Sequence, residues 1–346
     1  MILHLARRSR IMYMYIDFIN KNFDSDEHVF LFTGKSKVEE LEKFDNVLYL
    51  KNPVTIEKFL FKADKIIIHG LFNKKLNILL AFNPLFLKKS YWVLWGGDLY
   101  SYLKDDLSFK EKLYDKTIRT FLIKNLKGIV TLVKGDYDIV KKYYLTNAGY
   151  YEGFYPIPVS EKVLRKFNVK EGKRDSVVKV LTGNSGSKEN NYIDTFDKIA
   201  RFKNKNMEIY AVLSYGNQKE YINKVLNKGE ELFGDKFKPV KKFMPIDEYY
   251  KFLTEIDIYI SNHKRQQGLG NLYIMSFLGK KIYIRKDTSM WNFFKNELGL
   301  TIYDIEILKD EEYKDFINFE YGEENSLKSK KLFENSYSKN IWEKIW

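Results

Sequence analysis

Cysteine is absent from this chain of 346 residues. Its absence excludes disulfides, thiolate metal sites and cysteine nucleophiles, and a chain without disulfides is typical of a reducing cytoplasm. No secretory signal is visible either, because the short apolar run 1–6 leads into Arg7 and Arg8, whereas a signal peptide carries its charge first. We expect this run to form an opening strand, and we expect a cytoplasmic protein.

Long apolar runs are also missing. The longest, Leu76–Leu87, is flanked by lysines on both sides and is shorter than the roughly 20 residues that a bilayer-spanning helix needs. Basic flanks around an apolar, aromatic segment are typical of a contact with a membrane surface. A buried helix with solvated ends gives the same pattern, so the segment is compatible with either structure.

The motifs of several large protein classes have no match in the sequence. We find no zinc-finger spacing, no aromatic RNA-binding signature and no basic heptad region. A P-loop with its lysine, a complete G-x-G-x-x-G fingerprint, a G-x-S-x-G elbow and a metal-spaced cluster of His, Asp and Glu are missing as well. We therefore expect no nucleic-acid partner, no metal and no cofactor.

The chain does have an excess of positive charge. Lysine and arginine number 59 against 46 aspartates and glutamates, a formal charge of +13. Hydrophobic residues make up 45% of the chain, which is typical of a globular protein. A basic surface attracts nucleic acid, nucleotide phosphates or anionic lipid headgroups, and charge alone does not choose among these.

Strands alternate with helices along most of the chain. In the second half we expect strands at 176–182, 207–213, 237–240, 257–261 and 281–285, and helices at 191–202, 219–233, 245–255 and 266–278. In the first half we expect strands at 2–5, 28–32, 46–50, 65–68, 91–94 and 128–133, and helices at 12–22 and 106–125. This alternation predicts an α/β protein with parallel sheets and helical crossovers.

Two prolines and a charged loop indicate a domain boundary. Pro156 and Pro158 are followed by the polar stretch 170–175. We expect one Rossmann-like domain over residues 1–160 and a second over 170–315, with the tail at about 320–346 packing back on the first. Two such domains facing each other leave a cleft at the carboxyl ends of both sheets, where this class of fold binds its ligands.

Two glycine-rich turns follow expected strands of the second domain. The first consists of Gly183, Asn184, Ser185 and Gly186, and the second of Arg265, Gln266, Gln267 and Gly268. Each precedes a helix, where backbone N–H groups attract phosphate, and a guanidinium matches the charge of a diphosphate. A plain turn without a ligand has the same composition. Two glycine-rich turns at strand exits of one sheet, however, favour a binding site for a nucleotide diphosphate.

The first domain carries aromatic and acidic residues after the expected strand 91–94. Trp95, Gly96, Gly97 and Asp98 follow one another there. A Trp ring stacks on sugar rings, and an Asp can bind hydroxyls or act as a general base. Asp98 also suits the N-cap of the following helix, so the sequence leaves two roles for it.

His4 and His69 also stand at the ends of expected strands. An imidazole with a near-neutral pKa suits the deprotonation of an acceptor hydroxyl. Structural histidines are common as well, and both roles stay open. Asp136 and Asp138 have the spacing of metal-dependent glycosyltransferases of another fold, but they precede a helical stretch, where paired acids favour the helix N-terminus.

These pieces together resemble the 4-acetamido-4,6-dideoxygalactose (Fuc4NAc) transferases of enterobacterial common antigen synthesis, a 4-alpha-L-fucosyltransferase-like family with a GT-B architecture. The segments that carry the resemblance are His69–Asn73, Trp92–Tyr100, Lys134–Asp136, Gly183–Gly186 with Asn191, and Arg265–Gly270. The chain departs from the family's usual residues at Gly97 and at Ser214-Tyr215-Gly216.

The resemblance implies a metal-independent glycosyltransferase that moves a Fuc4NAc-type sugar from a TDP-sugar to a polyprenyl-diphosphate-linked saccharide. It implies a peripheral protein at the cytoplasmic face of the inner membrane. The donor would bind at the two glycine-rich turns with Asn191 and Tyr215, and Asn73, Trp95, Gly96 and Gly97 would lie on the acceptor side. His69, Asp98 or His4 would be the base if the reaction inverts configuration, and none is needed if it retains it.

Two alternatives stay open at this point. A GT-B transferase that uses a UDP- or GDP-sugar in O-antigen or capsule assembly would share these features. A basic, non-catalytic protein that binds nucleic acid or a membrane surface would explain the charge. That second alternative leaves the two glycine-rich strand exits unexplained.

Overall fold

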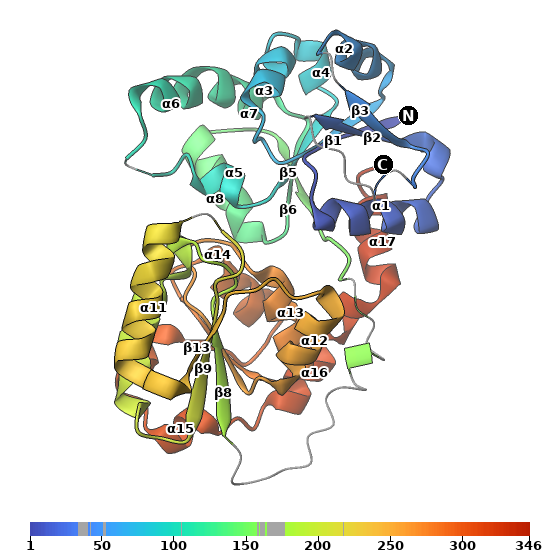
Figure 1. The fold of residues 1–346 in the computed structure, drawn as a ribbon. Helices are drawn as coiled ribbons and strands as arrows, with labels where there is room; N and C mark the ends of the chain where they lie inside the picture. The colour runs from blue at the N-terminus through green and yellow to red at the C-terminus, as the bar shows by residue number, and fades with distance from the viewer. Residues whose placement is uncertain are drawn as a thin grey trace. The chain divides into compact units, whose positions relative to one another are not determined.

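The computed structural model describes residues 1–33, 41, 43–50, 53–104, 106–157, 159, 163–164, 177–216 and 218–346. The chain divides into two compact units (Figure 1), of which unit 1 comprises Met1–Pro158 with Asn335–Trp346 and unit 2 comprises Val159–Glu334. The expected charged loop 170–175 lies outside the described residues. The chain returns to unit 1 at Asn335, later than the expected residue 320.

Unit 1 is built on one sheet in which each strand pairs in parallel with its neighbours. The strand order is β3-β2-β1-β4-β5-β6-β7, so the direction of winding reverses between β1 and β4. The strands are β1 (Ile2–Ala6), β2 (His28–Thr33), β3 (Val47–Leu50), β4 (Lys65–His69), β5 (Ser90–Leu94), β6 (Gly128–Thr131) and β7 (Gly149–Glu152).

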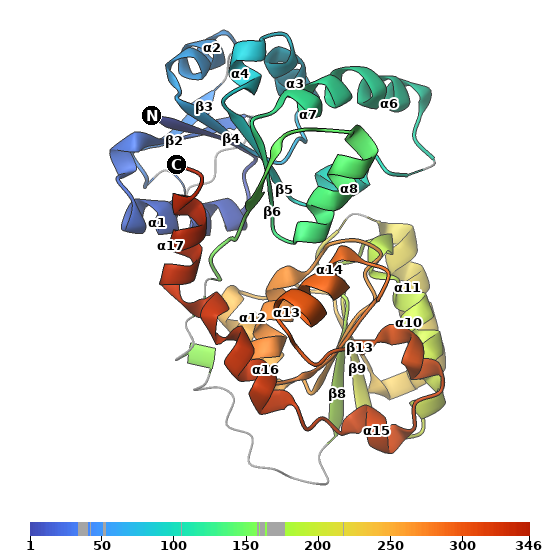
Figure 2. The same ribbon diagram turned by 180° about the vertical axis from the view of Figure 1, so that it is seen from behind.

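Helices cover both faces of this sheet (Figures 1 and 2). They are α1 (Arg10–Asn22), α2 (Pro53–Lys62), α3 (Lys74–Ala81), α4 (Pro84–Leu87), α5 (Gly97–Tyr100), α6 (Phe109–Tyr114), α7 (Thr120–Asn125), α8 (Lys134–Tyr144) and α17 (Asn335–Glu343). Side-chain caps explain where some begin. The Ser9 hydroxyl accepts from Met12 N–H at the start of α1, and Ser108 and Glu111 form a capping box at α6.

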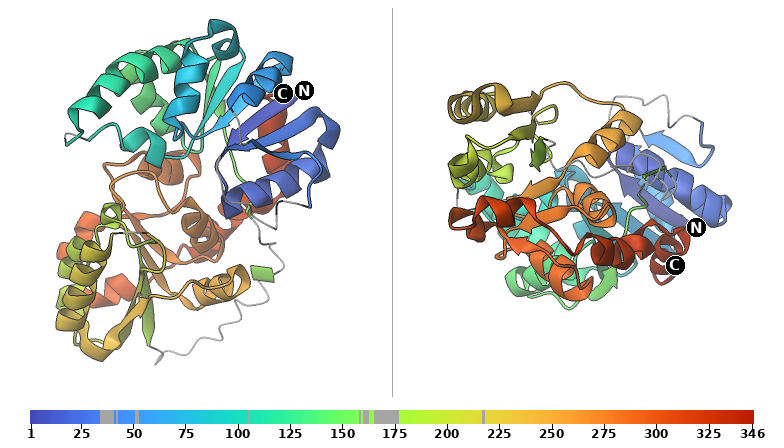
Figure 3. Two further views of the ribbon diagram at one scale, coloured as in Figure 1. Left: turned by 45° about the horizontal axis from the view of Figure 1, so that its top comes forward. Right: turned by 90° about the horizontal axis from the view of Figure 1, so that it is seen from below.

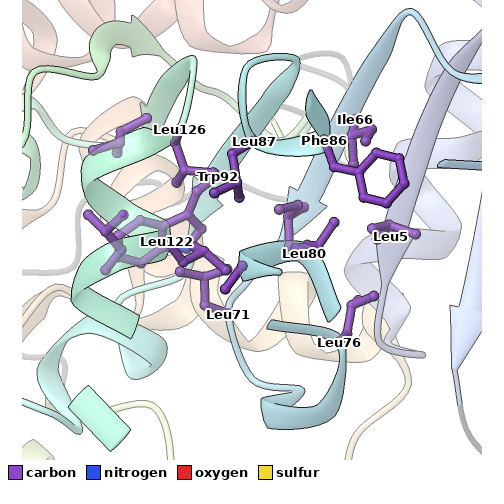
Figure 4. Close-up of a cluster of buried hydrophobic side chains, with 14 of the residues drawn as sticks. Leu5, Ile66, Leu71, Leu76, Leu80, Phe86, Leu87, Trp92, Leu122 and Leu126 are labelled. Carbon is purple, nitrogen blue, oxygen red and sulfur yellow. The ribbon is translucent and has the colours of Figure 1, made fainter. Parts of the chain in front are cut away.

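One face of the sheet packs on α2, α3, α4, α7 and α8. Its buried cluster includes Leu5, Leu80, Phe86, Trp92 and Leu122 (Figure 4). The face is apolar because alternate residues of every strand point into it, while the facing helices contribute leucines at helical spacing.

The opposite face packs on α1 and α17. Met12 and Ile16 of α1 join Trp342 of α17 over Phe30 and Phe32 of β2. Trp342 Nε1 donates to the Phe154 carbonyl at 2.7 Å, which ties the C-terminal helix to the end of the sheet. The two ends of the chain consequently lie close together (Figure 3).

Unit 2 repeats the plan with a second parallel sheet. Its strand order is β10-β9-β8-β11-β12-β13, so the winding reverses between β8 and β11. The strands are β8 (Val178–Thr182), β9 (Met207–Val212), β10 (Phe237–Val240), β11 (Ile258–Ser261), β12 (Lys281–Ile284) and β13 (Tyr303–Asp304). The helices are α10 (Tyr192–Ile199), α11 (Lys219–Phe233), α12 (Ile246–Glu255), α13 (Leu269–Phe277), α14 (Ser289–Asn292), α15 (Tyr313–Ile317) and α16 (Gly322–Ser329). The predicted α/β class with parallel sheets is confirmed.

Three local features differ from the sequence predictions. Strands β7 and β13 were not expected, since both are short edge strands without a buried apolar run. The expected helix 106–125 is interrupted by a π-helical turn at Asp115–Arg119. Both ends of this turn are buried, and their side chains form an ion pair at 3.4 Å that the sequence pattern does not reveal.

Candidate active site

The two glycine-rich turns of unit 2 leave adjacent strands. Gly183 follows β8 and the turn at Arg265 follows β11, and these strands pair with each other at the point where the sheet reverses its winding. In doubly wound folds, loops diverge at this point of the carboxyl edge and leave room for a ligand. The structure thus brings together the two turns that the sequence analysis singled out separately.

Gly183 is required by the shape of the first turn. Its φ is +65°, and a Cβ there would lie 2.3 Å from the Tyr192 hydroxyl oxygen. That hydroxyl is itself fixed, because it donates to the Val212 carbonyl at 2.6 Å and lies 3.0 Å from the Ser185 carbonyl. A side chain at 183 would therefore displace the turn.

Gln267 links the second turn to the first. Its Nε2 donates to Asn184 Oδ1 at 2.7 Å and to the Ser185 hydroxyl at 3.1 Å. Asn190 holds the first turn from the other side, because its Oδ1 accepts from Asn184 N–H at 2.8 Å and its Nδ2 donates to Ser185 at 3.0 Å. These contacts preorganise both turns as one polar surface. Asn190 was not predicted, since an amide in a polar loop has no distinctive pattern.

Helix α13 begins at this surface. Its N-cap is Gly268, with φ +68°, and no side-chain cap is found there among the described residues. A Cβ at 268 would come within 2.9 Å of the His263 ring, so glycine is needed for close packing as well. The first N–H groups of an α-helix lack intrahelical acceptors and suit an anion.

Arginine side chains stand at the exits of two neighbouring strands. Arg265, after β11, is half-buried and donates from Nη1 to the Gln266 carbonyl at 3.1 Å. Arg285, after β12, pairs with Asp287 and approaches Asn262 Oδ1 at 3.4 Å. The sequence analysis missed Arg285, although its position as the last residue of the expected strand 281–285 is a usable signal.

Buried hydrogen-bond acceptors without partners gather in the same loop. Gln266 Oε1, Gln267 Oε1 and His263 Nε2 have no hydrogen-bond partner among the described residues. His263 Nδ1 lies 3.0 Å from the Gln267 carbonyl, so this nitrogen carries the proton and Nε2 is an acceptor. Burial lowers the pKa of His263 to about 4, which keeps the ring neutral. The sequence analysis missed His263, which lies shortly after an expected strand.

Asn191 and Tyr215 border the turns in different ways. Asn191 adopts the left-handed conformation at the N-cap of α10, with φ +54°. The Tyr215 carbonyl accepts from Gly186 N–H at 2.5 Å, while its ring is 71% exposed. Tyr215 is therefore anchored by its backbone and presents its aromatic face to a ligand or to solvent.

In unit 1, Asp98 is enclosed by N–H donors. Its carboxylate accepts from Leu71 N–H at 3.0 Å, Trp92 Nε1 at 2.6 Å and Trp95 N–H at 3.0 Å, and the residue is 1% exposed. Asp98 lies in the first turn of α5, whose N-cap is Gly96 with φ +77°. The geometry favours a role in positioning the loops after β4 and β5 over the predicted role as base.

His4 and His69 are buried in a chain of rings. His4 lies in the middle of β1 and not at its end, contrary to the expectation. Its Nδ1 is 3.1 Å from His69 Nε2, its Nε2 is 2.9 Å from His28 Nδ1, and His69 Nδ1 is 2.6 Å from the Tyr155 hydroxyl. Burial lowers the pKa of His4 well below its ordinary value, that of His28 to about 4 and that of His69 to about 3. Neither predicted histidine reaches the surface.

Of the predicted acceptor-side residues, Trp95 lies among aromatic rings. Its Nε1 donates to the Tyr155 hydroxyl at 2.7 Å, and its ring contacts Phe72 edge-on. Gly97 is close to the same Phe72 ring, and Arg7 lies over that ring at 4.9 Å. Asn73 is the N-cap of α3 and accepts from Leu76 N–H at 3.2 Å. An aromatic surface with one guanidinium is thus assembled at the carboxyl ends of β1, β4 and β5.

The paired acids Asp136 and Asp138 do not meet. Asp136 is buried in the first turn of α8 and accepts from the Tyr100 hydroxyl at 2.7 Å, whereas Asp138 is exposed. Within the described part of the chain, no group of three or more His, Cys, Asp or Glu residues could hold a metal ion.

Comparison with known proteins agrees with this architecture. A glycosyltransferase of Rickettsia africae is similar over 99% of this chain and 98% of its own, at 13% identity and a TM-score of 0.66. The Anabaena protein HepE, in complex with UDP and glucose, is similar over 99% and 98% at 12% identity and a TM-score of 0.69. WaaG, a glycosyltransferase involved in lipopolysaccharide biosynthesis, is similar over the same shares at 10% identity and a TM-score of 0.61.

Two Rossmann-like units, each a parallel sheet covered by helices, show the GT-B fold. The model of glycosyl transferase group 56, the 4-alpha-L-fucosyltransferases, matches residues 31–315. The chain belongs to this family and is a glycosyltransferase, as the resemblance in its motifs predicted.

Proposed function

We propose that the protein transfers a 4-acetamido-4,6-dideoxygalactose-type sugar from a TDP-sugar to a polyprenyl-diphosphate-linked saccharide, in the synthesis of a cell-surface polysaccharide of the enterobacterial common antigen type. The observation that carries the proposal is the pair of turns at the exits of β8 and β11, bridged by Gln267. Backbone N–H groups of both turns and the Arg265 guanidinium supply positive charge for the leaving diphosphate without a metal.

The unpartnered acceptors of the β11 turn support a sugar next to that diphosphate. An ionised diphosphate offers no hydrogen-bond donor, so it cannot satisfy Gln266 Oε1, Gln267 Oε1 or His263 Nε2. Hydroxyl and amide N–H groups of an amino sugar can. A buried acceptor left without a donor costs roughly 1–3 kcal/mol, and this cost is relieved when the sugar binds.

A transfer assay tests the donor and the acceptor together. The purified protein is incubated with TDP-, UDP- and GDP-linked sugars and a synthetic polyprenyl-diphosphate saccharide, in the presence of a chelator. Transfer from the TDP-linked 4-acetamido sugar is the expected result. The second candidate is a UDP-sugar, which the UDP complex of the similar Anabaena protein favours. Transfer from UDP-sugars alone would replace the TDP donor by that candidate.

The apolar segment after β4 suits a membrane surface. It forms α3 and α4, whose inner residues Leu80 and Leu87 are buried. Phe82, directly after α3, is 77% exposed, and Leu85 of α4 is 66% exposed. Phe61 of α2, whose ring contacts Phe86 of α4, is 63% exposed. The segment thus has buried residues, as a core helix does, and exposed apolar residues, which a membrane contact needs. No helix in the described ranges is long and apolar enough to cross a bilayer.

We propose that Phe61, Phe82 and Leu85, a surface patch flanked by exposed lysines such as Lys62 and Lys88, hold the protein at the cytoplasmic face of the inner membrane. Apolar side chains enter the headgroup boundary while lysines bind anionic lipid, and such two-part anchoring falls with salt. It would bring the protein to a lipid-linked acceptor.

The double variant Phe82→Ser, Leu85→Ser is expected to bind anionic vesicles at least about tenfold more weakly. The reason is that removing two apolar side chains from the interface loses well over about 1.4 kcal/mol. Cosedimentation with phosphatidylglycerol vesicles measures the change. Phe243→Ser, which removes an exposed ring of unit 2, is the matched control and should bind as the wild type does. Equal vesicle binding by all three proteins would argue against this membrane surface.

A further inference from the structure

Three of the four histidines of the chain form one hydrogen-bonded row across the sheet of unit 1. His28 begins β2, His4 lies in the middle of β1 and His69 ends β4, on the face of the sheet that α1 covers. Because these strands are adjacent and parallel, the row runs diagonally. It starts near the amino end of β2 and reaches the carboxyl edge of the sheet at β4.

The row ends at Tyr155, a residue that the sequence analysis did not select. The residue is half-buried, and its hydroxyl lies 2.6 Å from His69 Nδ1 and accepts from Trp95 Nε1 at 2.7 Å. An indole nitrogen only donates, so Trp95 occupies one lone pair of the phenol oxygen. The other lone pair has no donor among the described residues, and it lies beside the aromatic surface of Trp95 and Phe72.

The contacts give the row a direction. Among the described residues, the Tyr155 hydroxyl contacts the donor Trp95 and His69 Nδ1, so we assign the hydroxyl proton to the His69 contact. His69, being neutral, then carries its proton on Nε2 and donates to His4 Nδ1. His4 then carries its own proton on Nε2 and donates to His28 Nδ1. His69 and His4 each accept on Nδ1 and donate from Nε2, and His28 accepts on Nδ1, which is the arrangement a proton relay requires.

We propose that Tyr155 takes the proton of the acceptor hydroxyl and passes its own proton into the row His69–His4–His28. This inference rests on the proposed transfer to a hydroxyl. It assigns to Tyr155 the contact with the acceptor that the buried His69 and His4 cannot make. The three histidines touch no substrate and act through Tyr155.

The proposed transfer conserves atoms and charge. The acceptor oxygen forms the new bond to the anomeric carbon while the bond from that carbon to the diphosphate breaks, and the diphosphate leaves with the electron pair. The acceptor proton moves to the Tyr155 oxygen, and the Tyr155 proton moves to His69 Nδ1. The Nε2 proton of His69 moves to His4 Nδ1, and that of His4 moves to His28 Nδ1.

The relay leaves no charge in the centre of the core. His69 and His4 each gain one proton and lose another, so both remain neutral, as burial demands of them. The surplus proton reaches His28, where the charge of Asp24 stabilises the protonated ring, while burial, the larger effect, lowers the pKa and favours release of the proton. Burial also holds the pKa of Tyr155 well above its ordinary value, so the phenol returns to its protonated form.

A first experiment tests the direction of the row and needs no substrate. Long-range nitrogen–proton NMR of protein labelled with ¹⁵N-histidine distinguishes the two neutral tautomers, and single His→Gln variants assign the signals. We expect Nε2–H for His4, His28 and His69 at neutral pH. A proton on His69 Nδ1 would make Tyr155 an acceptor from His69 and would overturn the relay, whatever reaction the protein catalyses.

A second experiment tests the proton transfer with a matched pair of tyrosines. Tyr155→Phe removes the hydroxyl of the relay. Tyr15→Phe removes a hydroxyl of the same ring cluster that is buried and has no hydrogen-bond partner among the described residues. Tyr155→Phe should lower kcat about 10²-fold or more, as expected for loss of a proton-transfer group. Tyr15→Phe should keep kcat, and both variants should bind TDP as the wild type does.

Replacing His28, at the far end of the row, distinguishes a proton relay from a purely structural role of the histidines. His28→Gln should lower kcat with an unchanged KM. A relay of several protons predicts that the wild-type rate depends non-linearly on the deuterium content of the solvent, and in His28→Gln this dependence should become linear. A structural role predicts lower stability with the isotope effect unchanged. Wild-type kcat in Tyr155→Phe would overturn the relay. Absence of transfer by the wild type from every nucleotide sugar would instead refute the proposed function, and the tautomers would still decide the direction of the row.

Discussion

Replacing Asp98 by alanine is expected to lower the free energy of unfolding of unit 1 by at least about 3 kcal/mol, because each buried donor left unpaired costs roughly 1–3 kcal/mol. The variant leaves the N–H groups of Leu71, Trp92 and Trp95 without an acceptor, because in the wild type all three donate to the Asp98 carboxylate. Urea unfolding followed by tryptophan fluorescence measures the change in the free energy of unfolding, since two of the unpaired N–H groups belong to tryptophans.

The control for this variant is Asp138→Ala. Asp138 is an exposed carboxylate on α8, and its removal should change stability by less than about 0.5 kcal/mol. If Asp98→Ala kept its stability and lost only transfer, the positioning role would be wrong and the original prediction of a catalytic base would be supported.

Replacing Arg265 by alanine should lower kcat by about 10²–10³, the effect of removing one group that stabilises charge in a transition state. The half-buried guanidinium stands at the β11 exit, beside the turn that Gln267 joins to the β8 exit. Initial rates of sugar transfer, with the melting temperature recorded in parallel, separate chemistry from folding.

Lys264→Ala is the matched control, because it removes an exposed positive charge from the neighbouring position. It should keep most of the activity, since a solvated charge at a distance is largely screened. Wild-type turnover in Arg265→Ala would exclude Arg265 as the group that stabilises the diphosphate. Arg285, at the exit of β12, would then be the next residue to replace.

Much of the fold could be predicted because its determinants are local. Buried parallel strands are continuous apolar runs, such as Ile66–Ile68, and the crossover helices between them repeat apolar residues at helical spacing. The short edge strands β7 and β13 lack such runs. Because β7 was missed, Tyr155 directly beyond it was not recognised as a residue at a strand exit.

The site was predictable to the extent that strand exits in a parallel sheet converge. The turns at Gly183 and Arg265 could be paired in this way, because glycine marks positive φ and a close approach of backbones. The partners of side chains could not be predicted. The enclosure of Asp98 and the row through His28 depend on residues far apart in the sequence, and His28 begins its strand, the end where no ligand was expected.

We propose that unit 2 binds a nucleoside diphosphate at the exits of β8 and β11 without a metal. Thermal shifts of the purified protein with TDP, UDP, GDP, ADP and CMP, each with magnesium and with a chelator, test it most directly. A ligand at 100 times its Kd should add about 2.7 kcal/mol of stability. We predict stabilisation by TDP above the others, equal with and without magnesium, and lost in Arg265→Ala. No shift with any nucleotide would contradict the claim.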